Sequence, residues 1–216
     1  MTGHEIYKII RPLLEAQTEG LYWDFKRTLH NKGDIIRDIL AFSNSNYTGD
    51  SYIIVGVGEP KKPRSTNKIK LSTADRQRLN TQDNYLYLPA KWELHGLTAD
   101  DIEKMQKFSK ELTDKLESSM LITHPKCEFV PVMIKEKRWL YVIIIKHMPG
   151  VFISNKDILD DKKSDKIAVK QGVLYVRVAD ITIGAEPNIA TATEHIRVWK
   201  NYIDWITNSE GGKTNE

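Results

Sequence analysis

The sequence lacks the features that define several protein classes. Its one cysteine, Cys127, excludes an internal disulfide framework and a zinc site built from cysteines. The longest apolar run, residues 140–145, is far shorter than the roughly 20 residues that cross a bilayer. The six histidines have no metal-ligand spacing, and no Gly-x-x-x-x-Gly-Lys-Ser/Thr phosphate loop is present. We therefore expect a cytoplasmic protein with no membrane partner and no secretory signal.

Charge of one sign is also scarce overall. The 216 residues have a formal net charge of +3, with 40% hydrophobic and 28% charged residues, which is typical of a soluble globular protein. One short stretch differs from this balance, because residues 61–70 contain five basic side chains and no acid. These are Lys61, Lys62, Arg64, Lys68 and Lys70. The stretch is either a solvated loop or a surface that contacts the phosphates of a nucleic acid.

Hydrophobic periodicity predicts an α+β fold in which helices flank a mixed sheet. Helices are predicted over residues 5–16, 35–42 (with Asp34 as N-cap), 99–119 and 194–207, and strands over 21–26, 52–57, 127–134, 138–146, 166–170 and 173–179. The last two strands are expected to form a hairpin, and the last helix to have Ile196, Trp199, Ile203 and Ile206 on its apolar side. Pro131 predicts either an edge position for its strand or a β-bulge within it. We expect one domain over 1–208, with an irregular segment at 60–97 and a frayed tail at 209–216.

Three acidic residues and a lysine gather around the first two predicted strands. Alternation along residues 21–26 places Asp24 and Lys26 on the same polar face. Glu19 can join them only if Gly20 bends the chain, and Glu59 lies just beyond the second strand, after Gly58. Carboxylates beside a lysine are suited to phosphodiester chemistry assisted by Mg²⁺ or Mn²⁺, and they are equally typical of a surface ion pair.

The order and spacing of several short motifs resemble the AlbA-like domain of Schlafen proteins and their bacterial relatives. The motifs are Glu19 with Asp24-Phe25-Lys26, Ala41-Phe42-Ser43-Asn44, Gly49, Ile53-Ile54-Val55-Gly56-Val57, and Gly172-Val173-Leu174-Tyr175-Val176-Arg177. The family shows Glu-Ser-x-x-x-Glu-Phe-Lys, Ala-Phe-Ala-Asn, a Gly-Gly pair, Gly-Val-Asp-Asp and Tyr-x-Arg-Val in the same order. The resemblance covers residues 15–60 and 120–190 and implies an AlbA-like Schlafen core.

The resemblance implies a nucleic-acid partner, with RNA favoured over DNA. In some members it extends to metal-dependent endoribonuclease activity on structured RNA such as tRNA, with three carboxylates binding the metal. These map to Glu19, Asp24 and Glu59, and Lys26 would stabilise developing negative charge. Lys61, Lys62, Arg64, Lys68, Lys70 and Arg177 are the candidate nucleic-acid contacts. Because Schlafen nucleases build a positive groove from two similar lobes, a chain of this size predicts a homodimer, with a role in stress or antiviral defence.

The sequence departs from the family pattern at the carboxylates. Asp24 replaces a glutamate, and only Glu59 remains of the acidic pair, because Gly58 occupies the other position. Two alternatives to the nuclease therefore stay open. One is a non-catalytic DNA- or RNA-binding regulatory module, as in members known as DNA-binding parts of bacterial regulators. The other is a protein-interaction adaptor.

Overall fold

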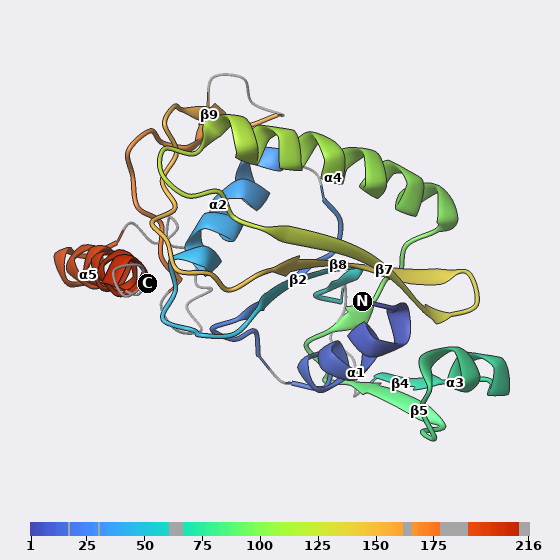
Figure 1. Ribbon diagram of the computed structural model, residues 1–216. Helices are drawn as coiled ribbons and strands as arrows, with labels where there is room; N and C mark the ends of the chain where they lie inside the picture. The colour runs from blue at the N-terminus through green and yellow to red at the C-terminus, as the bar shows by residue number, and fades with distance from the viewer. Residues whose placement is uncertain (17, 30, 61–66, 162–165, 178–189, 212–216) are drawn as a thin grey trace. The chain divides into compact units, whose positions relative to one another are not determined.

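The computed structural model describes all residues except 17, 30, 61–66, 162–165, 178–189 and 212–216 (Figure 1). The chain divides into two compact units. Unit 1 contains Met1–His30, Tyr52–Glu111 and Cys127–Ile144, and unit 2 contains Asn31–Ser51, Leu112–Lys126 and Ile145–Glu216. The single domain expected over 1–208 stays a prediction.

Unit 1 is built on a four-stranded sheet. Its order is β1 (Trp23–Lys26), β2 (Ser51–Val55), β8 (Arg138–Ile145) and β7 (Cys127–Lys135). β1 and β2 are parallel, with Asp24 opposite Ile53 and Phe25 opposite Ile54. Strand β7 lies at the edge of the sheet, as Pro131 predicts, since proline cannot donate a ladder hydrogen bond.

Helix α1 (Gly3–Leu14) supplies one wall of the core of unit 1. Its buried residues Ile6, Ile10 and Leu14 belong to the same apolar cluster as Phe25 and Ile54. A capping box between Thr2 and Glu5 begins the helix. The opposite face of β1 and β2 is also buried, because Ile53 and Val55 are fully inaccessible and Asp24 is 4% exposed.

In the stretch 60–97, for which the sequence shows no clear period, the described residues form four short elements, the first of which contains the last two lysines of the basic run. They are β4 (Asn67–Lys70), α3 (Thr73–Leu79), β5 (Tyr85–Leu88) and β6 (Glu93–Leu94). β4 pairs with β5, and β6 pairs with β3 (Val57–Gly58), both antiparallel. Figure 1 shows β4, β5 and α3 gathered together within unit 1. Elements of two to seven residues are too short for a periodicity test to detect.

Helix α4 (Ala99–Ser119) begins and ends close to its predicted bounds. Thr98 caps the helix through reciprocal hydrogen bonds with Asp101, in which the Asp101 amide donates to the threonine hydroxyl and the threonine amide donates to the carboxylate. In the described part of the chain, no helix is both long and apolar enough to cross a membrane.

Unit 2 begins with α2 (Lys32–Ser43), whose N-cap is Asn31 and not the predicted Asp34. The Asn31 side-chain oxygen accepts a hydrogen bond from the Gly33 amide at 3.0 Å, which an N-cap residue does. At the other end of α2, the Asn44 amide donates to the carbonyls of Phe152 and Tyr175, and its oxygen accepts from the Phe152 amide. This one side chain ties together three separate segments of unit 2.

The predicted hairpin of 166–170 with 173–179 is wrong in its partner. β10 (Ile167–Val169) pairs antiparallel with β9 (Ile158–Leu159), which lies between the predicted strands 138–146 and 166–170. Leu174 instead forms an isolated bridge with Ile153, and residues 178 and 179 lie outside the described residues. Charged residues between β9 and β10 conceal the earlier strand from a pattern search.

Helix α5 (Ala192–Gly211) forms where a closing helix was expected, but it packs through another face. Val198 is 4% exposed and belongs to the apolar cluster of unit 2, with Tyr202 packed against it. Ile196 and Ile203, predicted to face inward, are 69% and 56% exposed. The predicted frayed tail begins at residue 209, whereas α5 continues to Gly211 and residues 212–216 lie outside the described part.

Candidate nucleic-acid interface

The bend at Gly20 that the sequence requires is present. The Gly20 amide donates to the Trp23 carbonyl at 3.3 Å, which turns the chain back onto the start of β1. This turn brings a carboxylate oxygen of Glu19 within 2.8 Å of the Phe25 amide, which donates to it. Glu19 is 7% exposed, so its carboxylate has a structural role as the acceptor for a buried backbone amide.

Asp24 and Lys26 share one face of β1, as alternation predicts. The Lys26 ammonium lies 2.7 Å from an Asp24 carboxylate oxygen. The pair is more buried than a surface ion pair, since the Asp24 side chain is 6% exposed and that of Lys26 is 32% exposed. A buried carboxylate needs such a partner, because desolvation strongly disfavours its charged form.

Glu59 directly follows β3 and is exposed. Its backbone carbonyl accepts a hydrogen bond from Arg27 at 3.4 Å. At the neighbouring Gly58, an added Cβ would lie 3.0 Å from the Cβ of Arg27, so the backbone here leaves little room for the acidic side chain of the family pattern. The described residues, which include all three predicted metal ligands, contain no group of three or more His, Cys, Asp or Glu side chains placed to hold a metal ion.

A face rich in lysine and tyrosine forms on the β4–β5 ribbon. The register places Lys68 opposite Tyr87 and Lys70 opposite Tyr85, so all four side chains lie on one face. Leu86 and Leu88, which alternate with the tyrosines, belong to the core of unit 1. We call the face formed by Lys68, Lys70, Tyr85 and Tyr87 the ribbon face.

Within the ribbon face, the cations and the aromatic rings are in contact. The Lys68 ammonium lies 4.0 Å from the centroid of the Tyr85 ring and 5.6 Å from that of Tyr87. The two ring centroids are 6.2 Å apart. Tyr87 is 44% exposed, so much of its ring remains accessible to a ligand. The arrangement offers positive charge and an accessible π-surface side by side.

A hollow of about 450 Å³ adjoins the ribbon face. It is lined by β4, by β6 and by the two ends of the β7–β8 turn, where Lys135 and Arg138 are both exposed. Four of its seven lining residues are basic, namely Lys68, Lys70, Lys135 and Arg138, and one is acidic, Glu93. Positive charge concentrated on the walls of a hollow attracts polyanions.

The other predicted nucleic-acid contacts have different settings. Lys61, Lys62 and Arg64 lie outside the described residues. Arg177 belongs to unit 2, where its amide donates to the Ala41 carbonyl at 2.9 Å and its guanidinium lies 4.5 Å from the centroid of the Phe42 ring. Sequence reasoning missed Tyr85, Tyr87, Lys135 and Arg138. The available signal was the period-two alternation of Lys68-Ile69-Lys70 and Tyr85-Leu86-Tyr87-Leu88.

Comparison with known proteins identifies the family to which the chain belongs. The family model described as "Schlafen, AlbA_2" matches residues 19–186 of the 216. The chain therefore belongs to the Schlafen AlbA_2 family, which confirms the resemblance of its motifs and indicates a protein that binds nucleic acid. No curated protein and no solved structure matches the chain significantly.

Proposed function

We propose that the protein binds RNA through the ribbon face together with Lys135 and Arg138. The observation that carries this proposal is the register of β4 and β5, which sets two lysines directly across from two tyrosines on an outward face. Lysines neutralise phosphates, and tyrosine rings stack on bases that are not paired. RNA is the favoured partner because sequence-specific RNA recognition targets loops and bulges whose bases are unstacked.

The binding proposal is tested by fluorescence anisotropy with a labelled RNA stem-loop and with DNA of the same sequence. The variant Lys68→Ala/Lys70→Ala is expected to bind RNA at least tenfold more weakly. The slope of the logarithm of the binding constant against the logarithm of salt concentration should become less steep by roughly one to two. Lys107→Ala/Lys110→Ala on α4 is the matched control, because it removes the same charge from exposed positions that do not line the hollow. Equal losses in the two variants would reduce the effect to net charge and overturn the proposal.

A homodimer is part of the same proposal, because two copies would extend a positive surface. The apolar residues Ile196, Trp199 and Ile203 on α5, which are 69%, 38% and 56% exposed, support self-association. Light scattering after size exclusion, with and without RNA, measures the oligomeric state. A monomer at concentrations that saturate RNA binding contradicts the dimer and leaves the binding proposal intact. A cytoplasmic location and a role in antiviral defence belong to this proposal too, on the strength of the single cysteine and the family resemblance.

Endoribonuclease activity on structured RNA such as tRNA is the second candidate function. It is favoured by two buried carboxylates on or beside β1, namely Glu19, which accepts a hydrogen bond from the Phe25 amide, and Asp24, which pairs with Lys26. The proposed cofactor is Mg²⁺ or Mn²⁺, with Glu59 as the third ligand. Because the three carboxylates do not form a ligand group in the described structure, we assign no catalytic step to a metal.

Cleavage is tested by incubating the protein with total tRNA and Mn²⁺, using Glu19→Gln and Asp24→Asn. Both substitutions keep the size of the side chain and remove its charge. If the carboxylates are catalytic, both variants lose at least about 100-fold in cleavage rate while RNA binding is unchanged. Absence of cleavage by the wild type, or equal cleavage by all three proteins, excludes the nuclease and leaves the binding function standing.

A further inference from the structure

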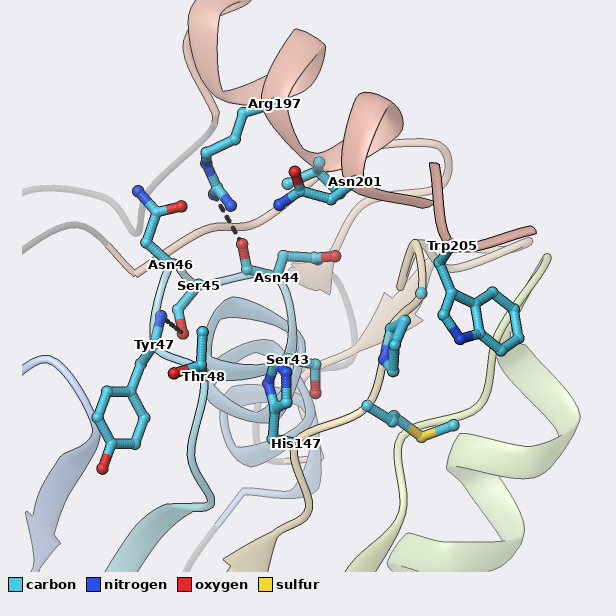
Figure 2. Close-up of a pocket in the computed structure, with 14 residues that line it drawn as sticks. Ser43, Asn44, Ser45, Asn46, Tyr47, Thr48, His147, Arg197, Asn201 and Trp205 are labelled. Atoms are coloured by element: carbon cyan, nitrogen blue, oxygen red, sulfur yellow. Dashed lines mark hydrogen bonds between the residues drawn. The ribbon is translucent and has the colours of Figure 1, made fainter. Parts of the chain in front are cut away.

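Unit 2 contains a polar hollow that shares no residue with the ribbon face. It has a volume of about 210 Å³ and lies between the 43–48 turn, the segment 147–150 and one side of α5 (Figure 2). Figure 2 shows Arg197 and Asn201 directed from α5 toward the turn, with Trp205 at the far end of the same helix face. The hollow is smaller than the roughly 300–1,000 Å³ of pockets that enclose a ligand, so it can hold only part of a small molecule.

Arg197 is the charged group of this hollow, and its side chain makes one hydrogen bond within the described part of the chain. One terminal nitrogen donates to the Asn44 carbonyl at 2.9 Å, whereas the Nε atom is buried and has no hydrogen-bond partner among the described residues. Among the described residues no carboxylate lies within ion-pair distance of the guanidinium. Burial lowers the pKa of Arg197, with Glu194 opposing this effect, which is the sign of a cation that lacks a close counter-charge. A guanidinium in this state suits an anion such as phosphate.

The remaining walls provide a ring surface and polar groups. Trp205 is 46% exposed and lines the hollow, and the adjacent Tyr202 ring stacks on it at a centroid distance of 6.1 Å. The side chains of Asn201 and His147 add hydrogen-bonding atoms. An indole held in place by a neighbouring ring is a surface on which a planar base can stack.

A purely structural role for Arg197 explains only part of this geometry. A cation at the C-terminal end of α2 stabilises the last carbonyls of the helix, which accounts for the bond to Asn44. It does not account for the buried Nε, for the absence of a counter-charge in the described structure, or for the exposed indole in the same hollow. We propose that this hollow binds a nucleoside monophosphate, with Arg197 holding the phosphate and Trp205 stacking on the base.

Isothermal titration of the full chain with AMP, adenosine and inorganic phosphate tests the proposal. AMP is expected to bind more tightly than either of its parts, because only AMP engages both groups. Arg197→Lys keeps a donor for the Asn44 carbonyl and loses the planar fork, so AMP affinity falls about tenfold or more. Trp205→Leu is expected to weaken AMP by a similar factor and to leave inorganic phosphate unchanged. Absence of AMP binding at millimolar concentration overturns the proposal.

Trp199→Leu is the matched control for Trp205→Leu. Both tryptophans contact the Tyr202 ring, at 6.4 and 6.1 Å between centroids, but only Trp205 lines the hollow. Lys200→Met, which removes an exposed charge from the same helix, is the control for Arg197→Lys. Neither control variant should change AMP affinity, and a loss in the controls equal to that in the hollow variants contradicts the site. An oligonucleotide carrying a 5′-phosphate separates a free nucleotide from the end of a chain, since it competes with AMP only if chain ends enter the hollow.

Discussion

The ammonium of Lys26 lies 2.7 Å from the carboxylate of Asp24, two residues earlier on the same strand. The acid is almost fully buried and the lysine is about one-third exposed. The pair therefore belongs neither to the solvated surface nor to a dry interior. The loss of stability is expected to depend on which partner is removed. A lone Asp24 carboxylate would be buried away from water, whereas a lone Lys26 ammonium could still be hydrated.

Replacing Lys26 by methionine removes the cation and leaves the buried Asp24 carboxylate without it. We expect Lys26→Met to lower the free energy of unfolding by about 1–3 kcal/mol. The double variant Asp24→Asn/Lys26→Met should recover part of this loss, since no buried charge then remains at the pair. Urea unfolding of the wild type, both single variants and the double variant gives the coupling energy. A Lys26→Met protein as stable as the wild type shows that the pair contributes nothing.

Two variants of Glu19 measure its structural role apart from any catalytic one. Glu19→Ala deprives the buried Phe25 amide of its acceptor and should cost about 1–3 kcal/mol of stability. Glu19→Gln keeps an oxygen acceptor and should cost less than half as much. The midpoint of urea unfolding measures both. If the two variants are equally stable, the hydrogen bond at 2.8 Å has no net energetic value.

Gly20 is required by close approach of the Trp23 ring. A Cβ at this position would lie 2.0–2.5 Å from atoms of the indole, so Gly20→Ala must displace the ring or the turn. We expect a loss of about 1–3 kcal/mol in unfolding free energy. Gly172→Ala serves as a comparison, because an added Cβ there meets nothing within 4 Å and the cost comes only from its positive φ of 71°. Unchanged thermal stability of Gly20→Ala contradicts the described turn.

Asp75 belongs to the capping box at the start of α3, and its ionisation is expected to make the stability of the fold depend on pH in the acidic range. Burial by itself raises the pKa of this carboxyl, but hydrogen bonds from Ser72 and the ion pair with Arg78 outweigh burial and hold the pKa below its ordinary value of 3.8. The unfolded chain then binds more protons than the folded chain at acidic pH. The stabilisation is complete above about pH 4 and is lost as the pH falls through the lowered pKa.

The prediction for Asp75 is measured as thermal midpoints between pH 6 and pH 2. Asp75→Asn should lower the midpoint at pH 6 and should show a shallower decline below pH 4 than the wild type. Parallel curves for the two proteins would mean that other carboxylates control acid unfolding.

Much of the fold was predictable because its long elements satisfy one rule over many residues. Helix α4 combines a cap at Thr98 with apolar spacing over 21 residues, and the β7–β8 hairpin has two long strands joined at a polar turn. The short elements between residues 57 and 94 gave no such signal. The capping box of Ser72 and Asp75 was the one local feature that could have revealed α3.

The residues of the candidate site also divide into some that the sequence predicted and some that it did not. Alternation correctly placed Asp24 beside Lys26, and the need for a bend at Gly20 was correct as well. The tyrosines of the ribbon face were missed because their pairing with Lys68 and Lys70 depends on register across a turn. The apolar side of α5 was assigned wrongly, because hydrophobic spacing identifies a stripe and does not say whether the protein covers it.

Asn44 is the last residue of the Ala-Phe-Ser-Asn motif. A polar residue in a family motif is often read as functional, but the role of Asn44 is structural. Its amide makes three hydrogen bonds to backbone groups of Phe152 and Tyr175, and it is 2% exposed. The asparagine of the signature therefore holds the fold together at this position, and its side chain is not evidence for a particular reaction. A match to this motif in another chain is accordingly evidence for the shared scaffold, whereas the partner and the reaction must be read from surfaces such as the ribbon face, which the motif does not include.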